Sequence, residues 1–264
     1  MNIKYYMALW GMDGTYEELI MDAASRGYSG IESPLPSADK QDEFKRLLAK
    51  YNMEYIAQVV TVGDHISSFT DQVRHAQTFE PSLIVSHSAR DRMNFAEQVI
   101  FFEEALKVER EVGIPVGHET HRSRAMYTPW TTANLLRQLP DLKITADFSH
   151  WCCVCESATL EEHQEDVKLA MQRAIHIHGR VGYDQGPQVP HPAAPEYADQ
   201  LHIFIAWWRE ILEWRIAGRY AYTSITPEFG PPGYMQTLPF TRQTVANLQE
   251  INEWMHQYLM KTLS

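Results

Sequence analysis

Residues 115–150 of the chain read PVGHETHRSRAMYTPWTTANLLRQLPDLKITADFSH and contain one complete strand–helix–strand unit. Two apolar runs, Pro115–His121 and Lys143–His150, flank a segment of helical character. Thr128 and Pro129 are typical of a helix N-terminus, because the threonine hydroxyl caps the first turn and proline fits its first position. A run, a helix and a second run in this order predict two parallel strands joined by a crossover helix.

The same unit recurs along the rest of the chain. Six further apolar runs alternate with segments in which apolar residues return at helical spacing, and these runs are Tyr5–Trp10, Gly30–Ser33, Tyr55–Val62, Leu83–His87, Ile175–Val181 and Tyr222–Phe229. Strict alternation predicts a parallel sheet with right-handed crossovers. Eight strands favour a closed barrel over an open, doubly wound sheet, and the lack of a glycine-rich dinucleotide motif or P-loop supports that choice. The predicted fold is therefore α/β, a (β/α)8 TIM barrel.

Length and composition agree with a single domain that spans residues 1–264. Barrels of this kind take about 250 residues, and 44% hydrophobic with 22% charged residues is an ordinary globular composition. The longest apolar run, Ile203–Trp208, is too short to cross a bilayer. The N-terminus has no signal-peptide pattern, so we expect a cytoplasmic protein.

The net charge of −11 bears on the choice of partner. Nucleic-acid-binding proteins normally carry a basic patch, so we expect neither a nucleic-acid nor a membrane partner. The three cysteines, Cys152, Cys153 and Cys155, form one cluster without the second pair that a structural zinc site needs. An odd, clustered set does not indicate a disulfide framework either. We interpret the cluster as thiols near the site that are open to oxidation, and assign them no function.

The longest non-helical stretch, Gly182 to Pro195, follows the seventh predicted strand. A loop of this length in a compact domain is more often functional than accidental. Barrels place their active sites at the C-terminal ends of the strands and in the loops that follow them. We therefore expect the functional residues on this face.

Acidic and imidazole side chains mark the ends of the last four predicted strands. Glu119 lies near the end of the fifth, Asp147 of the sixth, His178 of the seventh and Glu228 of the eighth. An isolated buried carboxylate would cost many kcal/mol or be forced to neutralise. One divalent cation pairs all of these groups at once, and three carboxylates with one imidazole suit Mn²⁺, Mg²⁺, Zn²⁺ or Co²⁺. The sequence therefore predicts a site for one divalent metal ion.

Other histidines near these strand ends are ambiguous. His176 and His178 are two residues apart, so both face the same way on a regular strand and only one need be a ligand. Beside Glu119, the same alternation turns His118 outward from the barrel and leaves His121 pointing inward.

With these residues in place, the whole chain resembles the xylose isomerase-like barrel superfamily, which includes sugar (phosphate) isomerases and epimerases, inosose dehydratases and apurinic endonucleases. Glu119, Asp147, His178 and Glu228 match its Glu–Asp–His–Glu metal set by strand order. Asp147-Phe148-Ser149-His150 matches its recurring Asp-x-x-His element. Residues 180–188, RVGYDQGPQ, resemble a bacterial subgroup known only as isomerase- or epimerase-like.

The resemblance implies roles for individual side chains. In the resembling epimerases the two glutamates are both metal ligands and the acid–base pair, which implies these roles for Glu119 and Glu228. His150 matches a substrate-facing histidine. Arg180 is a second candidate for substrate binding, because its planar fork of donors suits a carboxylate or phosphate, although a salt bridge that anchors its loop explains it equally well. His87 is a third candidate, as a substrate contact, as a ligand of an additional metal, as in apurinic endonucleases, or as a core histidine.

Several activities remain open. The leading expectation is an isomerase or epimerase of a small sugar or sugar derivative that acts through an enediolate. A dehydratase of the inosose type would expel a β-hydroxyl from the same intermediate. A zinc-dependent phosphoesterase needs further histidines, for which His65, His87 and His191 are available, but the seventh loop reads Pro-His-Pro at residues 190–192 where that branch has an Asp-x-His pair. A barrel that only binds a ligand is weakened, because all four ligand types are present.

The expected partner is a small, carbohydrate-like molecule. A homo-oligomer is a further expectation, since Trp207, Trp208 and Trp214 enrich one predicted helix. A helix that faces the core explains these tryptophans as well as an interface does.

Overall fold

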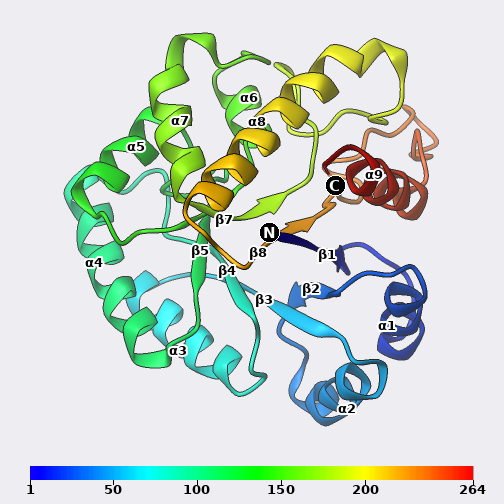
Figure 1. The fold of residues 1–264 in the computed structure, drawn as a ribbon, viewed down its shortest axis with the longest axis horizontal. Coiled ribbons are helices and arrows are strands. Elements are labelled where there is room, and N and C mark those ends of the chain that lie inside the picture. The colour runs from blue at the N-terminus through cyan, green and yellow to red at the C-terminus, as the bar shows by residue number, and fades with distance from the viewer. Residues whose placement is uncertain (264) are drawn as a thin grey trace.

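Over residues 1–263, which the computed structural model describes, the chain forms a closed barrel of eight parallel strands (Figure 1). The strands are β1 (Asn2–Ala8), β2 (Gly30–Pro34), β3 (Glu54–Val60), β4 (Leu83–His87), β5 (Val116–Glu119), β6 (Ile144–Ala146), β7 (Ala174–His178) and β8 (Tyr222–Thr226). Each strand pairs with the next along the chain, and β8 closes on β1. The predicted (β/α)8 fold is confirmed.

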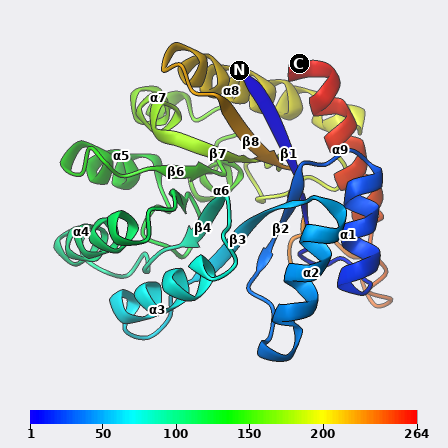
Figure 2. The ribbon, with the colours of Figure 1, turned by 60° about the horizontal axis from the view of Figure 1, so that its bottom comes forward.

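Helices surround this barrel on the outside (Figures 1 and 2). They are α1 (Tyr16–Ser25), α2 (Gln41–Tyr51), α3 (His65–Gln77), α4 (Phe95–Val112), α5 (Pro129–Gln138), α6 (Ser149–Val154), α7 (Gln164–Arg173), α8 (Ala198–Ala217) and α9 (Leu248–Leu263). Thr128 caps the first turn of α5 with Pro129 at its first position, as predicted. Both termini lie at the end of the barrel where the strands begin (Figure 2). No helix among residues 1–263 is long and apolar enough to cross a membrane.

The barrel interior changes from apolar to polar along the strands. Tyr6, Ile56, Leu83 and Val85 form an apolar cluster inside the barrel. Side chains alternate along a strand, so Gln58 and His87, two residues further on, face the same interior. The polar layer therefore lies nearer the C-terminal ends of the strands.

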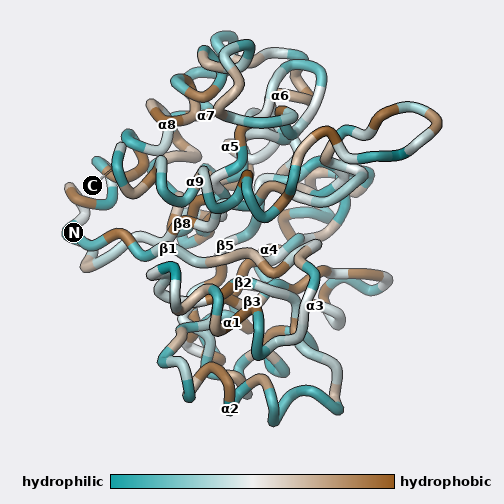
Figure 3. Tube along the Cα trace, turned by 90° about the vertical axis from the view of Figure 1, so that its right-hand side faces the viewer, coloured by the Kyte–Doolittle hydropathy of each residue, from teal (hydrophilic) through white to brown (hydrophobic). Residues whose placement is uncertain are grey.

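The larger apolar core lies between the strands and the helices. Phe44, Phe69, Phe102 and Trp208 are at most 1% exposed in this layer. Figure 3 shows the matching pattern, with hydrophobic stretches alternating with hydrophilic ones along the helices. Burial on one helical face and on the outer strand face keeps the barrel rigid, so the ends of the strands hold side chains in defined positions.

The predicted strand Lys143–His150 is wrong beyond Ala146. The structure ends β6 at Ala146 and begins α6 at Ser149. The backbone N–H and the hydroxyl of Ser149 both donate to Asp147 Oδ1, and these bonds turn the chain into the helix. His150 and the cysteine cluster therefore lie on a short helix above the barrel.

The longest irregular stretch is also not the predicted one. Residues 227–247 join β8 to α9 and exceed the loop after β7, which ends at the short helix Pro195–Tyr197. This stretch lies between β8 and α9, drawn in orange to red in Figure 1. Four prolines at positions 227, 231, 232 and 239 keep it from forming a helix. It follows the C-terminal end of β8, so it lies on the same face as the predicted site.

Candidate metal centre and active site

The four predicted metal ligands come together at the C-terminal ends of the strands. Glu119 is the last residue of β5, His178 is the last of β7, and Asp147 and Glu228 closely follow β6 and β8. One ligand atom from each side chain lies within 4.8 Å of all the others. All four residues are buried, and the most accessible, Glu228, is only 4% exposed.

The centre of this group is His178 Nδ1. It lies 3.0 Å from Glu228 Oε2, 3.4 Å from Glu119 Oε1 and 4.0 Å from Asp147 Oδ2. None of these contacts has the alignment of a hydrogen bond, and within residues 1–263 neither His178 Nδ1 nor Glu119 Oε2 has a hydrogen-bond partner. Buried polar atoms are rarely left without partners. Three carboxylates and one imidazole nitrogen gathered without mutual hydrogen bonds are the donor set that a divalent cation requires.

The electrostatics of this group reflect its close packing. Burial opposes a charge on His178, but the carboxylates of Glu228, Glu32 and Glu119 outweigh it and raise the pKa of the imidazole well above its usual value. Burial also opposes the charge of Glu119, yet His87, His121 and His178 hold the pKa of that carboxyl well below its usual range. Burial raises the pKa of Asp147 to about 6, against the effect of the neighbouring Arg180 guanidinium.

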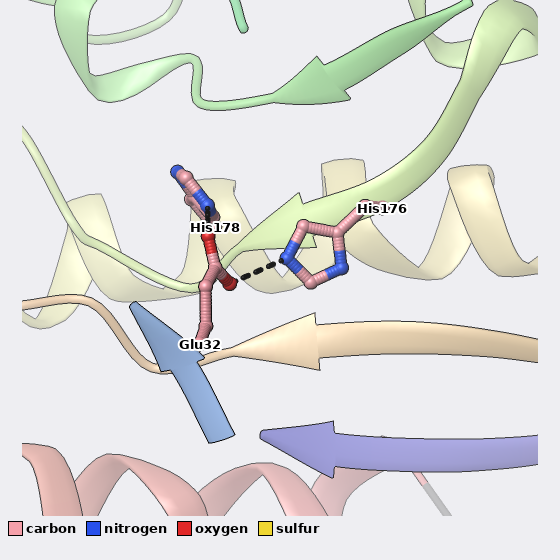
Figure 4. Close-up of side chains that lie close together, drawn as sticks. All are labelled: Glu32, His176 and His178. Carbon is pink, nitrogen blue, oxygen red and sulfur yellow. Dashed lines mark hydrogen bonds and ion pairs between the residues drawn. The ribbon is translucent and has the colours of Figure 1, made fainter. Parts of the chain in front are cut away.

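A second group of possible ligands, Glu32, His176 and His178, shares His178 with the first (Figure 4). Its atoms are satisfied by hydrogen bonds within the protein. Glu32 accepts from His178 Nε2 at 2.8 Å and from His176 Nε2 at 3.1 Å, while His176 Nδ1 lies 2.7 Å from Ser224 Oγ. This group therefore needs no cation, and of the two histidines it is His178 that belongs to the predicted metal set.

Glu32 and Gln58 are functional-site residues that the sequence analysis missed. The Gln58 amide donates to Glu32 Oε1 at 2.9 Å and to Glu228 Oε1 at 3.0 Å, so it joins the two groups. A signal was available for Glu32, because it is the one charged residue in the predicted strand Gly30–Ser33. A carboxylate within a buried strand indicates a satisfied polar network or a functional site.

The three predicted substrate-binding residues also surround the ligand group. His87 Nε2 lies 2.5 Å from Glu119 Oε2, without hydrogen-bond alignment. Arg180 is buried, pairs with Asp147 and donates to Ser149 Oγ at 3.1 Å. The same guanidinium donates to His150 Nε2 at 2.9 Å, and His150 Nδ1 is left without a partner.

Tyr234, from residues 227–247, covers the ligand group and was also missed. Its ring packs edge-on against Trp10, with 5.0 Å between ring centroids, and its hydroxyl lies 3.1 Å from His121 Nε2. The guanidiniums of Arg180 and Arg122 lie 4.7 and 4.9 Å from its ring centroid. Nothing in the sequence pattern marks this tyrosine, because its loop has no periodicity.

The loop after β7 holds the turn that carries Glu228. The Gln188 side chain accepts from the backbone N–H of Gly230 at 2.7 Å and donates to its carbonyl at 3.2 Å. The loop predicted to be functional therefore supports the site through Gln188.

His118 and His121 point as predicted. His118 turns outward, where its ring nitrogens contact Ser88 Oγ at 2.6 Å and Glu109 Oε1 at 2.8 Å. His121 faces the site, with its ring centroid 3.9 Å from that of His150. Burial lowers the pKa of His121 to about 3, so this imidazole is neutral.

The cysteines are free thiols on and just after α6. Burial raises the pKa of Cys152 well above its usual value and that of Cys155 to about 11. These two thiols therefore stay protonated, which lowers their reactivity toward oxidants.

No protein-family model matches the chain, and no curated protein matches it in sequence. Solved structures do match over the whole length. The probable 3-DHS dehydratase AsbF of Bacillus anthracis superposes with a TM-score of 0.65 at 14% identity, over 97% of this chain and 98% of that one. An AP endonuclease of family 2 from Brucella melitensis gives a TM-score of 0.63 at 13% identity, over 97% and 98% of the two chains.

A D-tagatose 3-epimerase-like protein gives a TM-score of 0.63 at 14% identity, over 100% of this chain and 97% of that one. The names of these three proteins cover three different reactions, and the identities are low, so the likeness is one of fold and does not choose an activity. The chain therefore shares the (β/α)8 barrel fold of these three proteins.

Proposed function

We propose that the protein is a divalent-metal-dependent isomerase or epimerase of a small sugar or sugar derivative. The observation that carries this proposal is the convergence of Glu119, Asp147 and Glu228 on His178 Nδ1 in a buried site. A cation bound there would give the unpartnered His178 Nδ1 a partner and leave coordination positions for a substrate. The matching folds support the proposal, since their names include an epimerase-like protein.

The chemistry divides between the cation and the side chains. A divalent cation held by Glu119, Asp147, His178 and Glu228 would polarise a substrate carbonyl and make the neighbouring C–H more acidic. Glu119 and Glu228 move the proton of this C–H. If one carboxylate removes it and the other returns it to the opposite face of the same carbon, the product is an epimer. Return to the neighbouring carbon gives an aldose–ketose isomerisation.

Each glutamate has one oxygen for the ligand group and a second oxygen outside it. Glu119 directs Oε1 toward His178 and Oε2 toward His87. Glu228 directs Oε2 toward His178, while its Oε1 accepts from Gln58. A carboxylate in this arrangement can hold a cation with one oxygen and accept a substrate proton with the other.

The substrate would lie between the ligand group and the side chains that cover it. His150 Nδ1, buried and without a partner, is a donor or acceptor for a hydroxyl group. Tyr234 and Trp10, whose rings pack edge to face, lie beside this space.

Two other activities are less well supported. A phosphoesterase of the endonuclease type needs more metal-ligating histidines. His87 contacts Glu119, and Glu119, His121 and His150 form a further candidate group, but among residues 1–263 neither His65 nor His191 belongs to one. His65 Nδ1 instead contacts Thr61 Oγ1 at 2.8 Å. A dehydratase would use the same proton abstraction and then release water, so a dehydratase and an isomerase differ here only in their product.

The proposal is tested first by metal content. The purified protein and its Glu119→Gln, Glu228→Gln and Glu104→Gln variants are incubated with Mn²⁺, Mg²⁺ or Zn²⁺, desalted and analysed for bound metal. Glu104 pairs with Lys107 on the surface and is the matched control. We expect about one ion per chain in the wild type and the control, with depletion in the two site variants. No bound metal in the wild type would refute the metal site.

The activity is tested on the metal-loaded protein in D₂O with a panel of ketoses, aldoses and their phosphates. Deuterium incorporation at the carbon beside the carbonyl, lost in Glu119→Gln and Glu228→Gln, is the expected result. A metal-loaded protein that exchanges no substrate proton across the panel would leave a binding function in place of catalysis. Loss of water without an isomeric product would indicate the dehydratase.

A further inference from the structure

Two guanidinium groups lie against Tyr234 near the ligand group, and a third arginine follows one of them closely in sequence. Arg122 and Arg180 lie against its ring at 4.9 and 4.7 Å from the centroid. Arg124 lies two residues after Arg122, and burial lowers the pKa of its guanidinium. Arg122 and Arg124 follow β5, whereas Arg180 follows β7.

Two of these three cations have no carboxylate partner. Arg180 pairs with Asp147 and Glu228. Within the described part of the chain, neither Arg122 nor Arg124 has a carboxylate oxygen within 4.0 Å. Arg124 is only 9% exposed and donates to the carbonyls of Thr61 and Ala89. A buried cation without a counter-ion is costly, and a chain of net charge −11 has many carboxylates that could have supplied one.

The charges of the site also leave room for an anion. Arg180 is already paired with Asp147 and Glu228. Arg122 forms no ion pair within residues 1–263, so its positive charge is available to an anion. Guanidinium groups bind carboxylate and phosphate oxygens through two parallel donors, which explains why arginines and not lysines gather here.

We propose that Arg122, beside Arg180 and Tyr234, binds an anionic group of the substrate, a carboxylate or a phosphate. This inference rests on the proposed function and names its substrate class as acidic sugars. The anion would lie beside Tyr234, with the carbonyl end of the molecule at the ligand group.

The test measures anion binding to the manganese-loaded protein by calorimetry. Inorganic phosphate and acetate are the probes, and the variants are Arg122→Gln, Arg122→Lys and the surface control Arg74→Gln, whose side chain pairs with Glu111. We expect Arg122→Gln to weaken binding of at least one anion tenfold or more, Arg122→Lys to weaken it less, and Arg74→Gln to have no effect. A larger loss for phosphate identifies a phosphate site, and a larger loss for acetate identifies a carboxylate site.

Equal dissociation constants in the wild type and Arg122→Gln would assign the anion to the metal ion and overturn the inference, as would no binding of either anion. Metal content of each variant is measured in parallel, so that failure of the metal site is distinguished from failure of the anion site. Anion binding that depends on Arg122 without any turnover would contradict the isomerase proposal and leave this site standing.

A separate observation concerns Glu32, which is 1% exposed and contacts His176 and His178 (Figure 4). Its Oε1 accepts from His178 Nε2 at 2.8 Å and from Gln58 at 2.9 Å. Its Oε2 accepts from His176 at 3.1 Å and from Thr226 Oγ1 at 2.5 Å. Four donors from three strands therefore hold both oxygens of this carboxylate in one orientation.

The contact between Glu32 and His178 determines which ring nitrogen of His178 has a free lone pair for a metal ion. A neutral imidazole carries one N–H, and a carboxylate oxygen 2.8 Å from Nε2 requires that N–H to lie on Nε2. The lone pair is then on Nδ1, which faces Glu119, Asp147 and Glu228. The structure assigns Glu32 as the positioning residue that fixes the tautomer and ring orientation of His178 for metal binding.

The test uses Glu32→Gln, whose amide cannot accept from both His176 and His178. The control is Glu54→Gln, a strand carboxylate at the opposite end of the barrel that bonds Lys4 and Tyr6. We expect the dissociation constant for Zn²⁺ to rise about 10- to 100-fold in Glu32→Gln and to stay unchanged in the control. Thermal unfolding without metal shows whether each variant is folded, and Glu32→Asp, which keeps the charge, should retain more affinity than Glu32→Gln.

A second readout does not depend on affinity. In the zinc-loaded wild type, ¹⁵N-resolved NMR should show a slowly exchanging proton on His178 Nε2, and this signal should shift or exchange faster in Glu32→Gln. A proton on Nδ1 in the wild type, or an unchanged Nε2 signal and zinc affinity in Glu32→Gln, would overturn the assignment.

Discussion

Metal binding should raise the thermal stability of this protein, and the Glu228→Gln variant should lose most of that gain. A ligand that binds only the native state stabilises it by RT ln(1 + [L]/Kd), which is about 4 kcal/mol for 1 mM metal and a micromolar site. The unfolding entropy of a chain of 264 residues is about 0.55 kcal/mol/K. The expected rise in Tm is therefore about 7 °C.

The variant is expected to behave differently because Glu228 Oε2 is the ligand atom nearest to His178 Nδ1, at 3.0 Å. If its loss weakens metal binding about 100-fold, the stabilisation at 1 mM metal falls to about 1.4 kcal/mol and the rise in Tm to about 2–3 °C. Differential scanning calorimetry with EDTA and then with 1 mM Mn²⁺ measures both values. The Glu104→Gln control should keep the full 7 °C shift.

Two results would refute this reasoning. No metal-dependent shift in the wild type would mean that the buried carboxylates hold no cation. An equal shift in the wild type and in Glu228→Gln would place the bound metal elsewhere in the chain.

Three further predictions concern residues outside the ligand group. His256 stacks on Tyr28 with 3.8 Å between ring centroids, and burial lowers the pKa of its imidazole from 6.5 to about 4. The free energy of unfolding should therefore be highest above about pH 6.5 and fall by at most about 3 kcal/mol as the pH drops to 4. Urea titrations across this range should show a smaller dependence of that free energy on pH in His256→Phe. Cys152, which is 0% exposed, should react with a thiol reagent only after unfolding, and a Cys152→Ser variant should show the same native thiol count as the wild type. Phe102 is 0% exposed on α4, so Phe102→Ala should lower the free energy of unfolding by about 3–5 kcal/mol in chemical denaturation. A decrease below about 1 kcal/mol would contradict its core position.

The fold could be predicted because the same strand–helix–strand pattern recurs along the chain. The strand–helix–strand unit at residues 115–150 repeats along the chain, and parallel strands joined by short connections have few other ways to bury both sheet faces. The strand boundaries were less well predicted, because they depend on local hydrogen bonds such as those from Ser149 to Asp147.

Part of the candidate site follows from the same logic. A closed parallel barrel brings the C-terminal ends of its strands together, so Glu119, Asp147, His178 and Glu228 could be grouped from their strand positions alone. The choice between His176 and His178 could not, because both face inward. The structure separates them by depth, since two residues along a strand are about 6.6 Å, and the deeper His176 bonds Glu32 and Ser224 instead.

The sequence by itself determined the barrel and the residue types at its mouth, because both depend on periodicity along the chain. Only the tertiary structure revealed the partners of those residues. Glu32 and Gln58 meet His178 and Glu228 across the barrel interior, and Tyr234 reaches the site from an irregular loop after β8. Such contacts join residues far apart in sequence, and they depend on barrel closure and side-chain packing, which no local pattern encodes.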